Sequence, residues 1–398
     1  MSKGYLAGQT IDVSIEKIVP NGFGMAFAEN LTVFVPLAVP GDRLRVRINQ
    51  IKGKTAFAEI ERIVDPSKQR VDPPCQYFGR CGGCDFQQMP YPVQLEAKIE
   101  IIRDCLRRIG KIDFPDEIRM IPSPKPFGYR TRAQWHLETR RKKTGYYGRN
   151  SNRVIDVETC SILSQELQGA FEELRKNIDW QAYWSETVRI EASAAGGEVS
   201  LFSDEIIEPT REIEFQLDGN RYFFNANTFF QGNFFLIGEL TETALAGAEG
   251  EKALDLYCGV GLFTLPLAKK FGTVIGVEAS DRAVDFAEKN AAVAGLENIG
   301  FYRRAVSDFL VLNPDELKEI DFVVLDPPRS GTEKGVIEGL IGAAPRRISY
   351  VSCEPSILAR DLRILEAGGY RIESITAIDL FPQTHHIETV VRMEKSSG

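Results

Sequence analysis

Residues 254–268, LDLYCGVGLFTLPLA, have the form of a strand, a glycine turn and a helix. Gly259 and Gly261 allow the backbone to turn tightly and let a ligand approach the start of the helix. Two glycines alone are weak evidence, because they lack the spacing of the dinucleotide fingerprint. Glu278 strengthens the prediction, because it ends the next apolar strand and an acid there can accept hydrogen bonds from a ribose diol. The sequence therefore predicts an adenosine-binding turn, and the alternative is an acid that only caps the helix from residue 281.

Strands and helices alternate from about residue 250 onward. The expected strands are KALDLY, TVIGVE, NIGFYRR, DFVVLD and RISYVS, and helical patterns follow at 262–270, 281–294, 333–343 and 355–366. Near-continuous apolar strands joined by helices indicate an α/β fold with a doubly wound parallel sheet. The last two strands, YRIESITAIDL and IETVVRME, are separated by too few residues for a crossover helix. They are expected to form an antiparallel pair.

The N-terminal half of the chain has a different pattern. Residues 8–64 read as five short strands broken by turns, which suggests a small OB-like β-barrel. A Pro- and Cys-rich stretch follows, then a helix at 91–109 and a mixed, strand-rich region with one amphipathic helix near 163–177. We expect three domains: an OB-like barrel (1–64), a mixed α+β central domain (65–230) and the doubly wound domain (231–398).

Charge is distributed unevenly along the chain. The net charge is -8, yet residues 119–153 hold ten Lys or Arg and one acid, Glu138. A concentrated basic segment in an acidic protein predicts a local phosphate-contacting surface, and a solvated loop is the alternative. No apolar run is long enough to cross a membrane, and the N-terminus lacks the apolar segment of a secretion signal. We expect a cytoplasmic protein.

Three reactive side chains are expected at the rim of the parallel sheet. Cys353 directly follows the strand RISYVS, and Asp326 ends the strand DFVVLD. Residues at the carboxyl ends of parallel strands point into the crevice where doubly wound folds bind their ligands. Glu388 begins the final strand and is either a surface residue or a poised base. For Cys353 the alternative is a buried, inert cysteine.

Four motifs in order, LDLYCGVG, LDPPRSG, SCEP and HHIE, resemble those of the RNA 5-methyluridine methyltransferases. The resemblance extends to FFQGN at 229–233 and to the cysteine-rich segment, and the N-terminal barrel resembles the TRAM domain, so nearly the whole chain is covered. The resemblance implies transfer of a methyl group from S-adenosylmethionine to C5 of a uridine in RNA. Cys353 would be the nucleophile that adds to C6, and Glu388 the base that removes the C5 proton.

The resemblance also implies which residues line the cofactor site. They are Gln231, Tyr257, Glu278 and Asp326, together with the two glycines of the turn. Two positions depart from the family pattern. Leu262 and Ala305 stand where some relatives carry polar residues that contact the cofactor.

Four of the seven cysteines have a spacing that suits a metal centre: Cys75, Cys81, Cys84 and Cys160. Four thiolates fit an iron–sulfur cluster or a structural zinc, but zinc sites usually come as two close pairs, which this spacing does not provide. Zinc or no metal is the alternative to a cluster. The family resemblance implies a 4Fe–4S cluster with a structural and RNA-organising role. Cys105 and Cys258 are expected to be packing residues.

Three other functions are alternatives to uridine methylation. A radical S-adenosylmethionine enzyme needs a C-x3-C-x2-C motif that this chain lacks. A non-catalytic RNA-binding relative would not need both Cys353 and Glu388. Cytosine methylation at C5 would use similar cysteine chemistry, but SCEP and HHIE match the uridine enzymes. The resemblance implies 23S ribosomal RNA as the target, because the barrel and the cluster-type cysteines go with the ribosomal branch of the family. Transfer RNA remains open, and no obligate protein partner is evident.

Overall fold

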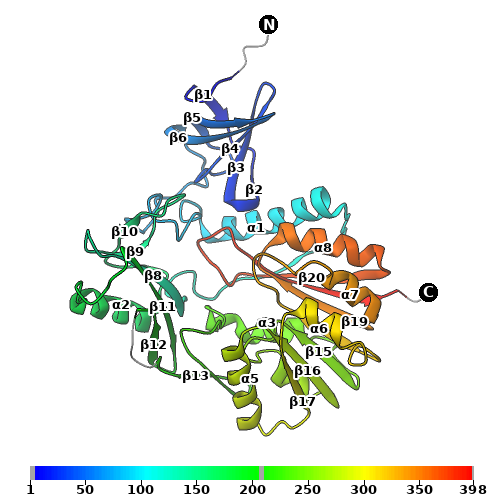
Figure 1. The fold of residues 1–398 in the computed structure, drawn as a ribbon. Helices are drawn as coiled ribbons and strands as arrows, with labels where there is room; N and C mark the ends of the chain where they lie inside the picture. Colours follow the sequence, from blue (N-terminus) through cyan, green and yellow to red (C-terminus); the bar gives the residue numbers. More distant parts are fainter. Residues whose placement is uncertain (1–4, 206–209, 397–398) are drawn as a thin grey trace.

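The computed structural model describes residues 5–205 and 210–396. Figure 1 shows a small β-barrel at the N-terminal end, a strand-rich central part and a large sheet flanked by helices. The expected first and third domains include residues 1–4 and 397–398, and the expected second domain includes residues 206–209. These residues lie outside the described part. The expected boundaries near residues 64 and 230 stay predictions.

The N-terminal barrel is built from one sheet with the strand order β1-β5-β6-β4-β3-β2. Leu44, Val46 and Ile48 are buried and alternate with exposed arginines, as the sequence predicts. The sheet has one strand more than the five expected, because the expected first strand, TIDVSIEKIV, is divided into β1 and β2. The strands are β1 (Thr10–Ser14), β2 (Lys17–Val19), β3 (Phe23–Ala28), β4 (Leu31–Val35), β5 (Arg43–Lys52) and β6 (Thr55–Asp65).

Helix α1 (Tyr91–Cys105) lies directly beneath the barrel in Figure 1 and continues as a π-helical turn, Leu106–Gly110. The central sheet has the order β10-β9-β8-β11-β12 and packs against α2 (Gln165–Asn177). Trp135 and Phe171 are fully buried between them. The central strands are β8 (Arg132–Glu138), β9 (Lys143–Tyr147), β10 (Val154–Asp156), β11 (Thr187–Ala195) and β12 (Glu198–Phe202), followed by the hairpin β13 (Ile213–Leu217) and β14 (Asn220–Phe224).

The large sheet has the order β17-β16-β15-β18-β19-β21-β20-β7. The five adjacent strands β17, β16, β15, β18 and β19 pair in parallel. Strand β21 runs antiparallel to both β19 and β20, as expected for the last two strands. The sequence did not predict the edge strand β7, because three residues are too few for a periodic pattern. The strands are β7 (Arg119–Ile121), β15 (Lys252–Leu256), β16 (Thr273–Glu278), β17 (Ile299–Arg303), β18 (Phe322–Leu325), β19 (Arg347–Ser352), β20 (Tyr370–Ile378) and β21 (Glu388–Lys395).

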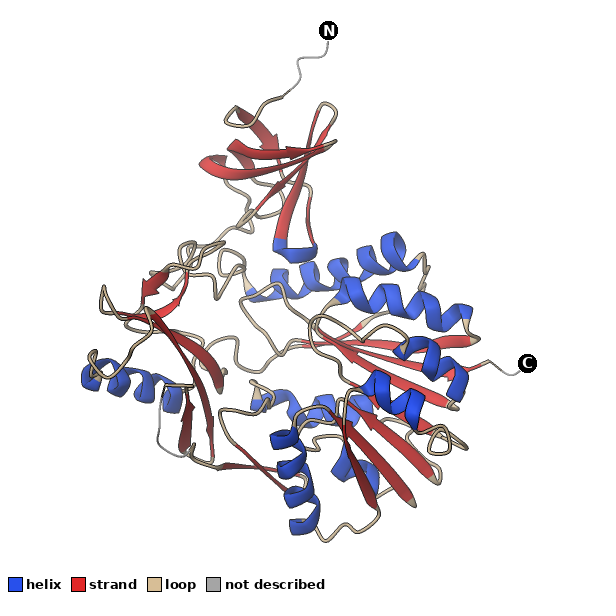
Figure 2. Cartoon of the chain, in the orientation of Figure 1, coloured by secondary structure: helices blue, strands red, loops and turns tan. Residues whose placement is uncertain are grey.

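Helices cover both faces of this sheet (Figure 2). Alternate strand residues point to opposite faces, so Leu254 and Val323 belong to one hydrophobic core, whereas Ala253 and Val324 belong to another. Each buried Val or Leu contributes about 1.5–3 kcal/mol, which makes these two cores the main stabilising element. The helices are α3 (Ile237–Ala244), α4 (Thr264–Ala268), α5 (Asp281–Val293), α6 (Val306–Leu312), α7 (Val336–Ala343) and α8 (Pro355–Ala367). Among the helices described, none combines the length and apolar character needed to cross a membrane.

Candidate active site

Cys353 and Glu388 meet at the carboxyl end of the parallel strands. Ser352, the last residue of β19, pairs with Thr389 of the antiparallel β21. The next residues outward along this ladder are therefore Cys353 and Glu388, which face each other where the two strands separate. The thiol is half-buried, whereas Glu388 is only 3% exposed. The structure thus brings together the two residues that the sequence predicts as nucleophile and base.

The carboxyl group of Glu388 is buried without full hydrogen bonding. Its Oε1 has no hydrogen-bond partner among the described residues. Burial and the nearby Asp326 raise the pKa of Glu388 well above its usual value, and Arg329 opposes this effect. Burial raises the pKa of Asp326 as well. A buried carboxyl group with a raised pKa and a free oxygen is suited to exchange a proton with a ligand in the crevice.

Arg329 is a residue of this site that the sequence reasoning did not single out. Burial and the charge of Glu388 raise the pKa of the Cys353 thiol to about 12, whereas Arg329 lowers it by its charge and by a hydrogen bond. Thiolate, not thiol, is the nucleophile, so a neighbouring cation favours the reactive form. The signal in the sequence was a cation three residues after Asp326, in a loop fixed by two prolines.

The glycine turn and Glu278 form the predicted adenosine-binding side of the crevice. Gly259 and Gly261 have φ angles of 53° and 93°, which glycine adopts without strain. The carboxylate of Glu278 accepts hydrogen bonds from the backbone N–H of Gly259 at 3.2 Å and of Ser280 at 2.8 Å. The side chain that caps α5 is that of Ser280, which accepts a bond from Ala283. Glu278 is therefore directed toward the glycine turn and is not the helix cap.

Tyr257 directly precedes this turn, and Gln231 contacts the neighbouring rim residue Asp326. Gln231 is 5% exposed, and its Nε2 donates a hydrogen bond of 3.4 Å to Oδ2 of Asp326. Tyr257 has a left-handed backbone conformation with φ of 64°, and its hydroxyl group hydrogen-bonds to Glu333. The Gln231 contact joins two of the predicted cofactor residues.

Asp255 is a second residue of the site that sequence reasoning missed. It is fully buried, Thr264 donates a 2.5 Å hydrogen bond to its Oδ2, and its Oδ1 has no partner in the described ranges. Burial raises its pKa to about 7, with smaller contributions from Asp326 and Glu278. The sequence feature that could have identified Asp255 is its place in the apolar strand before the glycine turn. An acid in that place could equally be an exposed strand residue.

The two departures from the family pattern have ordinary structural roles. Leu262 is buried, and its carbonyl oxygen accepts a 3.3 Å hydrogen bond from the Tyr222 hydroxyl. Ala305 is the N-cap residue that directly precedes α6. Neither position gives the turn a polar side chain.

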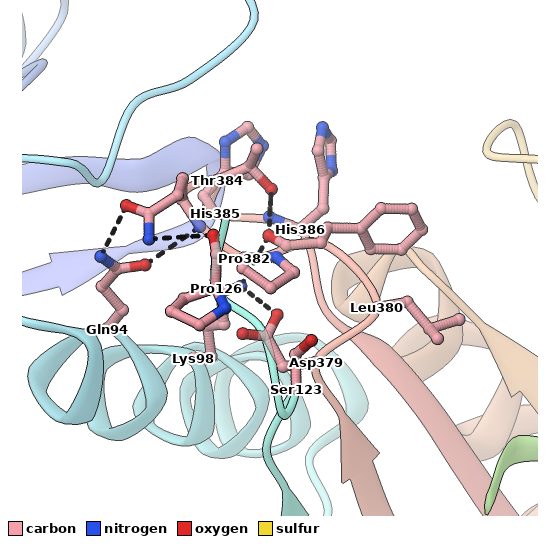
Figure 3. Close-up of polar contacts among 12 residues, drawn as sticks. Gln94, Lys98, Ser123, Pro126, Asp379, Leu380, Pro382, Thr384, His385 and His386 are labelled. Atoms are coloured by element: carbon pink, nitrogen blue, oxygen red, sulfur yellow. Dashed lines mark hydrogen bonds and ion pairs between the residues drawn. The ribbon is translucent and has the colours of Figure 1, made fainter. Parts of the chain in front are cut away.

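The loop of residues 379–387, which leads to Glu388, is held from two sides. On the α1 side, Lys98 forms a 2.5 Å ion pair with Asp379, and both side chains are fully buried (Figure 3). On the other side, Asp85 accepts hydrogen bonds from the backbone and ring nitrogens of His385, at 2.8 and 2.5 Å. Gln94 of α1 adds a 3.1 Å hydrogen bond from the backbone N–H of Gln383. These contacts fix the loop and thus the start of β21.

The four predicted metal ligands line one pocket, although Cys160 is far from the other three in sequence. Cys75, Cys81, Cys84 and Cys160 surround it together with the side chains of Arg130 and Tyr146. Burial raises the pKa of the Cys81 thiol to about 11, and Cys160 and Cys75 add to this effect. No group of three or more His, Cys, Asp or Glu side chains in residues 5–205 and 210–396 has the geometry to hold a metal ion as it stands. Cys105 and Cys258 are buried, as expected.

The basic segment 119–153 is only partly a free surface. Arg119, Lys125, Lys142 and Arg153 are exposed. By contrast, Arg130 lines the cysteine pocket, and Arg149 donates a 3.0 Å hydrogen bond to the carbonyl oxygen of Cys84. Arg140 and Arg141 form ion pairs with Glu186 and Glu138. Part of the positive charge therefore organises the central domain, and phosphate contact by the rest stays a prediction.

The antiparallel last strand separates this sheet from that of the dehydrogenases. Together with the glycine turn that faces Glu278, it defines a doubly wound S-adenosylmethionine-dependent methyltransferase. Residues 151–396 match the family described as tRNA (uracil-5-)-methyltransferase, and residues 6–60 match the TRAM domain. The chain belongs to the tRNA (uracil-5-)-methyltransferase family. It is an enzyme that methylates uracil C5 in RNA.

Individual relatives agree with this assignment. An uncharacterised RNA methyltransferase of Gloeobacter violaceus is 32% identical over 98% of both chains. The 23S rRNA (uracil(1939)-C(5))-methyltransferase RlmD of Shewanella amazonensis is 32% identical over 97% of this chain and 96% of the relative. The crystal structure of the Pyrococcus abyssi tRNA (uracil-54, C5)-methyltransferase with S-adenosyl-L-homocysteine has a TM-score of 0.75 and 25% identity, covering 96% of this chain and 100% of that one. The family and fold class predicted from the sequence are confirmed.

Proposed function

We propose that this enzyme methylates uridine in 23S ribosomal RNA through a covalent bond between Cys353 and C6 of the uracil. The observation that carries the covalent step is the facing position of Cys353 and Glu388 across β19 and β21. A thiol and a carboxyl group that lie beside each other at neighbouring strand ends can act on two adjacent carbons of a single ring. The glycine turn and Glu278 lie at the same edge of the sheet, because parallel β15 and β18 end together at Leu256 and Leu325, and the neighbouring β19 ends two residues further on, at Ser352.

The proposed chemistry requires the thiol to ionise. As thiolate, Sγ of Cys353 adds to C6, and the electron pair of the C5–C6 bond moves into the ring carbonyl to give an enolate. S-adenosylmethionine supplies, when bound, the sulfonium methyl group that C5 takes up. Glu388 as carboxylate then removes the C5 proton, the C5–C6 double bond re-forms, and the Sγ–C6 bond breaks. Both Cys353 and Glu388 have raised pKa values, and Arg329 favours the ionised form of each.

A trapping experiment tests the covalent step. RNA that carries 5-fluorouridine at the target lacks the C5 proton, so the enzyme and RNA should stay joined after methyl transfer. Glu388→Gln should accumulate the same adduct on unmodified RNA, because the proton cannot be removed. Glu373→Gln on the neighbouring strand β20 is the matched control and should turn over normally. Absence of any adduct with wild-type enzyme would refute the covalent step, and normal turnover by Glu388→Gln would refute the base assignment.

The choice of ribosomal RNA is supported by the relative from Shewanella amazonensis, whose name specifies 23S rRNA and which matches this chain over almost its whole length. The alternative is transfer RNA, which the Pyrococcus abyssi enzyme methylates according to its title. Mapping of 5-methyluridine in both RNA classes from a deletion strain distinguishes them. Loss of one 5-methyluridine from 23S rRNA is expected, and loss from transfer RNA alone would contradict the proposal. The cytoplasmic location stays a prediction.

We also propose that the four cysteines of the pocket hold a 4Fe–4S cluster. The donor set fits, because four thiols from two distant segments line one pocket, and all four iron sites would have a protein ligand. Cluster binding would release protons from these thiols and would require small movements of their side chains. The cluster would hold Cys84 in place and, with it, the neighbouring Asp85. The Asp85 carboxylate in turn accepts a hydrogen bond from the loop that leads to Glu388. The cluster would therefore have a structural role.

Iron and acid-labile sulfide in anaerobically purified protein test this second proposal. Cys160→Ser should lose both, whereas Cys105→Ala, which alters a core cysteine outside the pocket, should keep them. Stoichiometric zinc without sulfide, or a protein without metal, would contradict a cluster.

A further inference from the structure

Three phenylalanine side chains point outward from neighbouring strands of the N-terminal barrel. Phe34 lies between the buried residues Val33 and Val35, and Phe57 likewise lies between two buried alanines. Side chains alternate along a strand, so both rings point away from the barrel core. Phe34 and Phe57 are register partners on β4 and β6, and their ring centroids are 5.7 Å apart. The Phe23 ring lies within 6.4 Å of both.

These rings form one wall of a groove between the barrel and α1. The opposite wall is the end of α1 with its π-helical turn, represented by Arg108 and Ile109, and the turn of residues 19–21 completes the lining. The groove encloses about 300 Å³, at the lower end of the sizes of small-ligand pockets. Ile109 is 40% exposed at its edge. The three rings are partly exposed, and grouped apolar surface of this kind marks ligand-binding grooves and interaction sites.

The rim of the groove carries excess positive charge. Lys17, Arg107 and Arg108 all form ion pairs with the single carboxylate of Asp104, at 2.7, 2.8 and 3.3 Å. Asp104 and Arg108 line the groove, and Lys17 and Arg107 are linked to it through Asp104. Together with Glu354, whose charge acts on the lining Cys105, these groups comprise three cations and two acids, so one positive charge is in excess. A polyanion with planar rings satisfies both features, because its phosphates meet the cations and a base meets the phenylalanines. An apolar peptide would satisfy only one of them.

The groove is also connected to the active site. Gly22, which ends the turn at the groove, has φ of 71°, and a Cβ built on it would lie 2.9 Å from Cβ of His385. His385 belongs to the loop that leads to Glu388. The barrel above α1 in Figure 1 therefore contacts the catalytic loop through this turn. An RNA strand whose target base enters the crevice could reach the groove with a nearby nucleotide.

We propose that this groove, which we call the barrel–α1 groove, holds one unpaired base of the RNA substrate stacked on Phe34 and Phe57, with the adjacent phosphate at Arg108. The proposal rests on RNA being the substrate, and it adds a second base-binding site outside the catalytic crevice. Stacking reads no sequence, because every base has a flat face. The groove would thus anchor and orient the RNA without choosing its sequence.

Direct binding tests the proposal. The probe is a mixed-sequence single-stranded oligoribonucleotide of about 12 nucleotides, labelled with fluorescein. Phe34→Ala and Phe57→Ala should each weaken its binding about tenfold. Phe27→Ala is the matched control, because Phe27 is 53% exposed on the same barrel but does not line the groove, and it should change binding less than about twofold. Equal affinities for wild type, Phe34→Ala and Phe57→Ala would overturn the proposal.

A second measurement uses only the wild-type protein, so it does not depend on how the variants fold. Oligoribonucleotides with 5-iodouridine are irradiated in the complex, and the crosslinked peptides are mapped by mass spectrometry. Crosslinks to Phe23, Phe34 or Phe57 support the groove, and crosslinks confined to other segments overturn it. If the two Phe→Ala variants instead abolish a dimer of this chain seen in light scattering while RNA affinity is unchanged, the groove is a protein interface and the proposal fails. Trapping by 5-fluorouridine RNA tests the proposed reaction separately.

Discussion

Replacing Lys98 with Met removes the cation from the ion pair beneath the catalytic loop. Its Nζ lies 2.5 Å from Oδ1 of Asp379 and also donates a 3.0 Å hydrogen bond to the carbonyl oxygen of Phe381. Both charged side chains are 0% exposed. After the replacement, the Asp379 carboxylate stays buried without its counter-charge. Its Oδ2 already has no hydrogen-bond partner in the described part of the chain.

The magnitude follows from the complete burial of the pair. Removing one partner of a buried ion pair destabilises a protein by about 3–5 kcal/mol, because the remaining charge is desolvated and uncompensated. Replacing both partners by apolar residues of similar size is often nearly neutral. Lys98→Met and Asp379→Leu should therefore each lower the free energy of unfolding by about 3–5 kcal/mol. The double variant should lie much closer to wild type, which gives a coupling energy of several kcal/mol.

Urea unfolding followed by far-ultraviolet circular dichroism measures these free energies. Tryptophan fluorescence is unsuitable, since the three tryptophans (135, 180 and 184) all lie in the central part of the chain. Lys289→Met is the matched control, because its ion pair with Glu212 is about 40% exposed on both sides and should contribute less than about 1 kcal/mol. The reasoning is refuted if Lys98→Met costs less than about 1 kcal/mol or if the two single effects simply add.

Three further changes test the active site. Glu388→Gln should speed alkylation of Cys353 by iodoacetamide at mildly alkaline pH, because the charge of Glu388 raises the pKa of the Cys353 thiol and keeps it protonated. An unchanged alkylation rate would contradict this electrostatic coupling. Asp255 has a folded pKa of about 7 against a usual value of 3.8, so its effect on stability is most favourable below about pH 4 and is lost as the pH rises to about 7. Asp255→Asn should therefore gain up to roughly 4 kcal/mol relative to wild type over that range, measured as the difference in unfolding free energy, and a difference independent of pH would refute the assignment. Gly261→Ala should lower the free energy of unfolding by about 1–3 kcal/mol, since the φ of Gly261 is 93° and a Cβ would lie 2.9 Å from a leucine of α4. It should also weaken S-adenosyl-L-homocysteine binding measured by calorimetry. Gly300→Ala, with open space around it, should have neither effect.

The sequence alone was sufficient for the elements that repeat a local pattern. The apolar strands of the large sheet, the antiparallel last pair and the alternating strands of the barrel were all predictable, because burial on one or two faces imposes a period on the residues. Short motifs at strand ends also identified Cys353, Asp326 and Glu388 as candidates. Cys353 and Asp326 lie at the same edge because parallel strands place their carboxyl ends together. Glu388 joins them because the antiparallel β21 begins where β19 ends.

Short elements and longer-range contacts required the tertiary structure. Strand β7 has three residues, and its pairing with β20 leaves no mark in the sequence. The sequence placed Arg329 in a rim loop, but only the packing of that loop shows that its charge acts on Cys353.

The barrel shows the same division most clearly. Alternation in β4 and β6 implies that Phe34 and Phe57 lie on the opposite face from the valines and alanines beside them. Only the docking of α1 against that face turns the outward rings into a groove. The physical reason is that local periodicity records which side of an element is buried, whereas a site depends on which distant elements meet and on the charges they bring together.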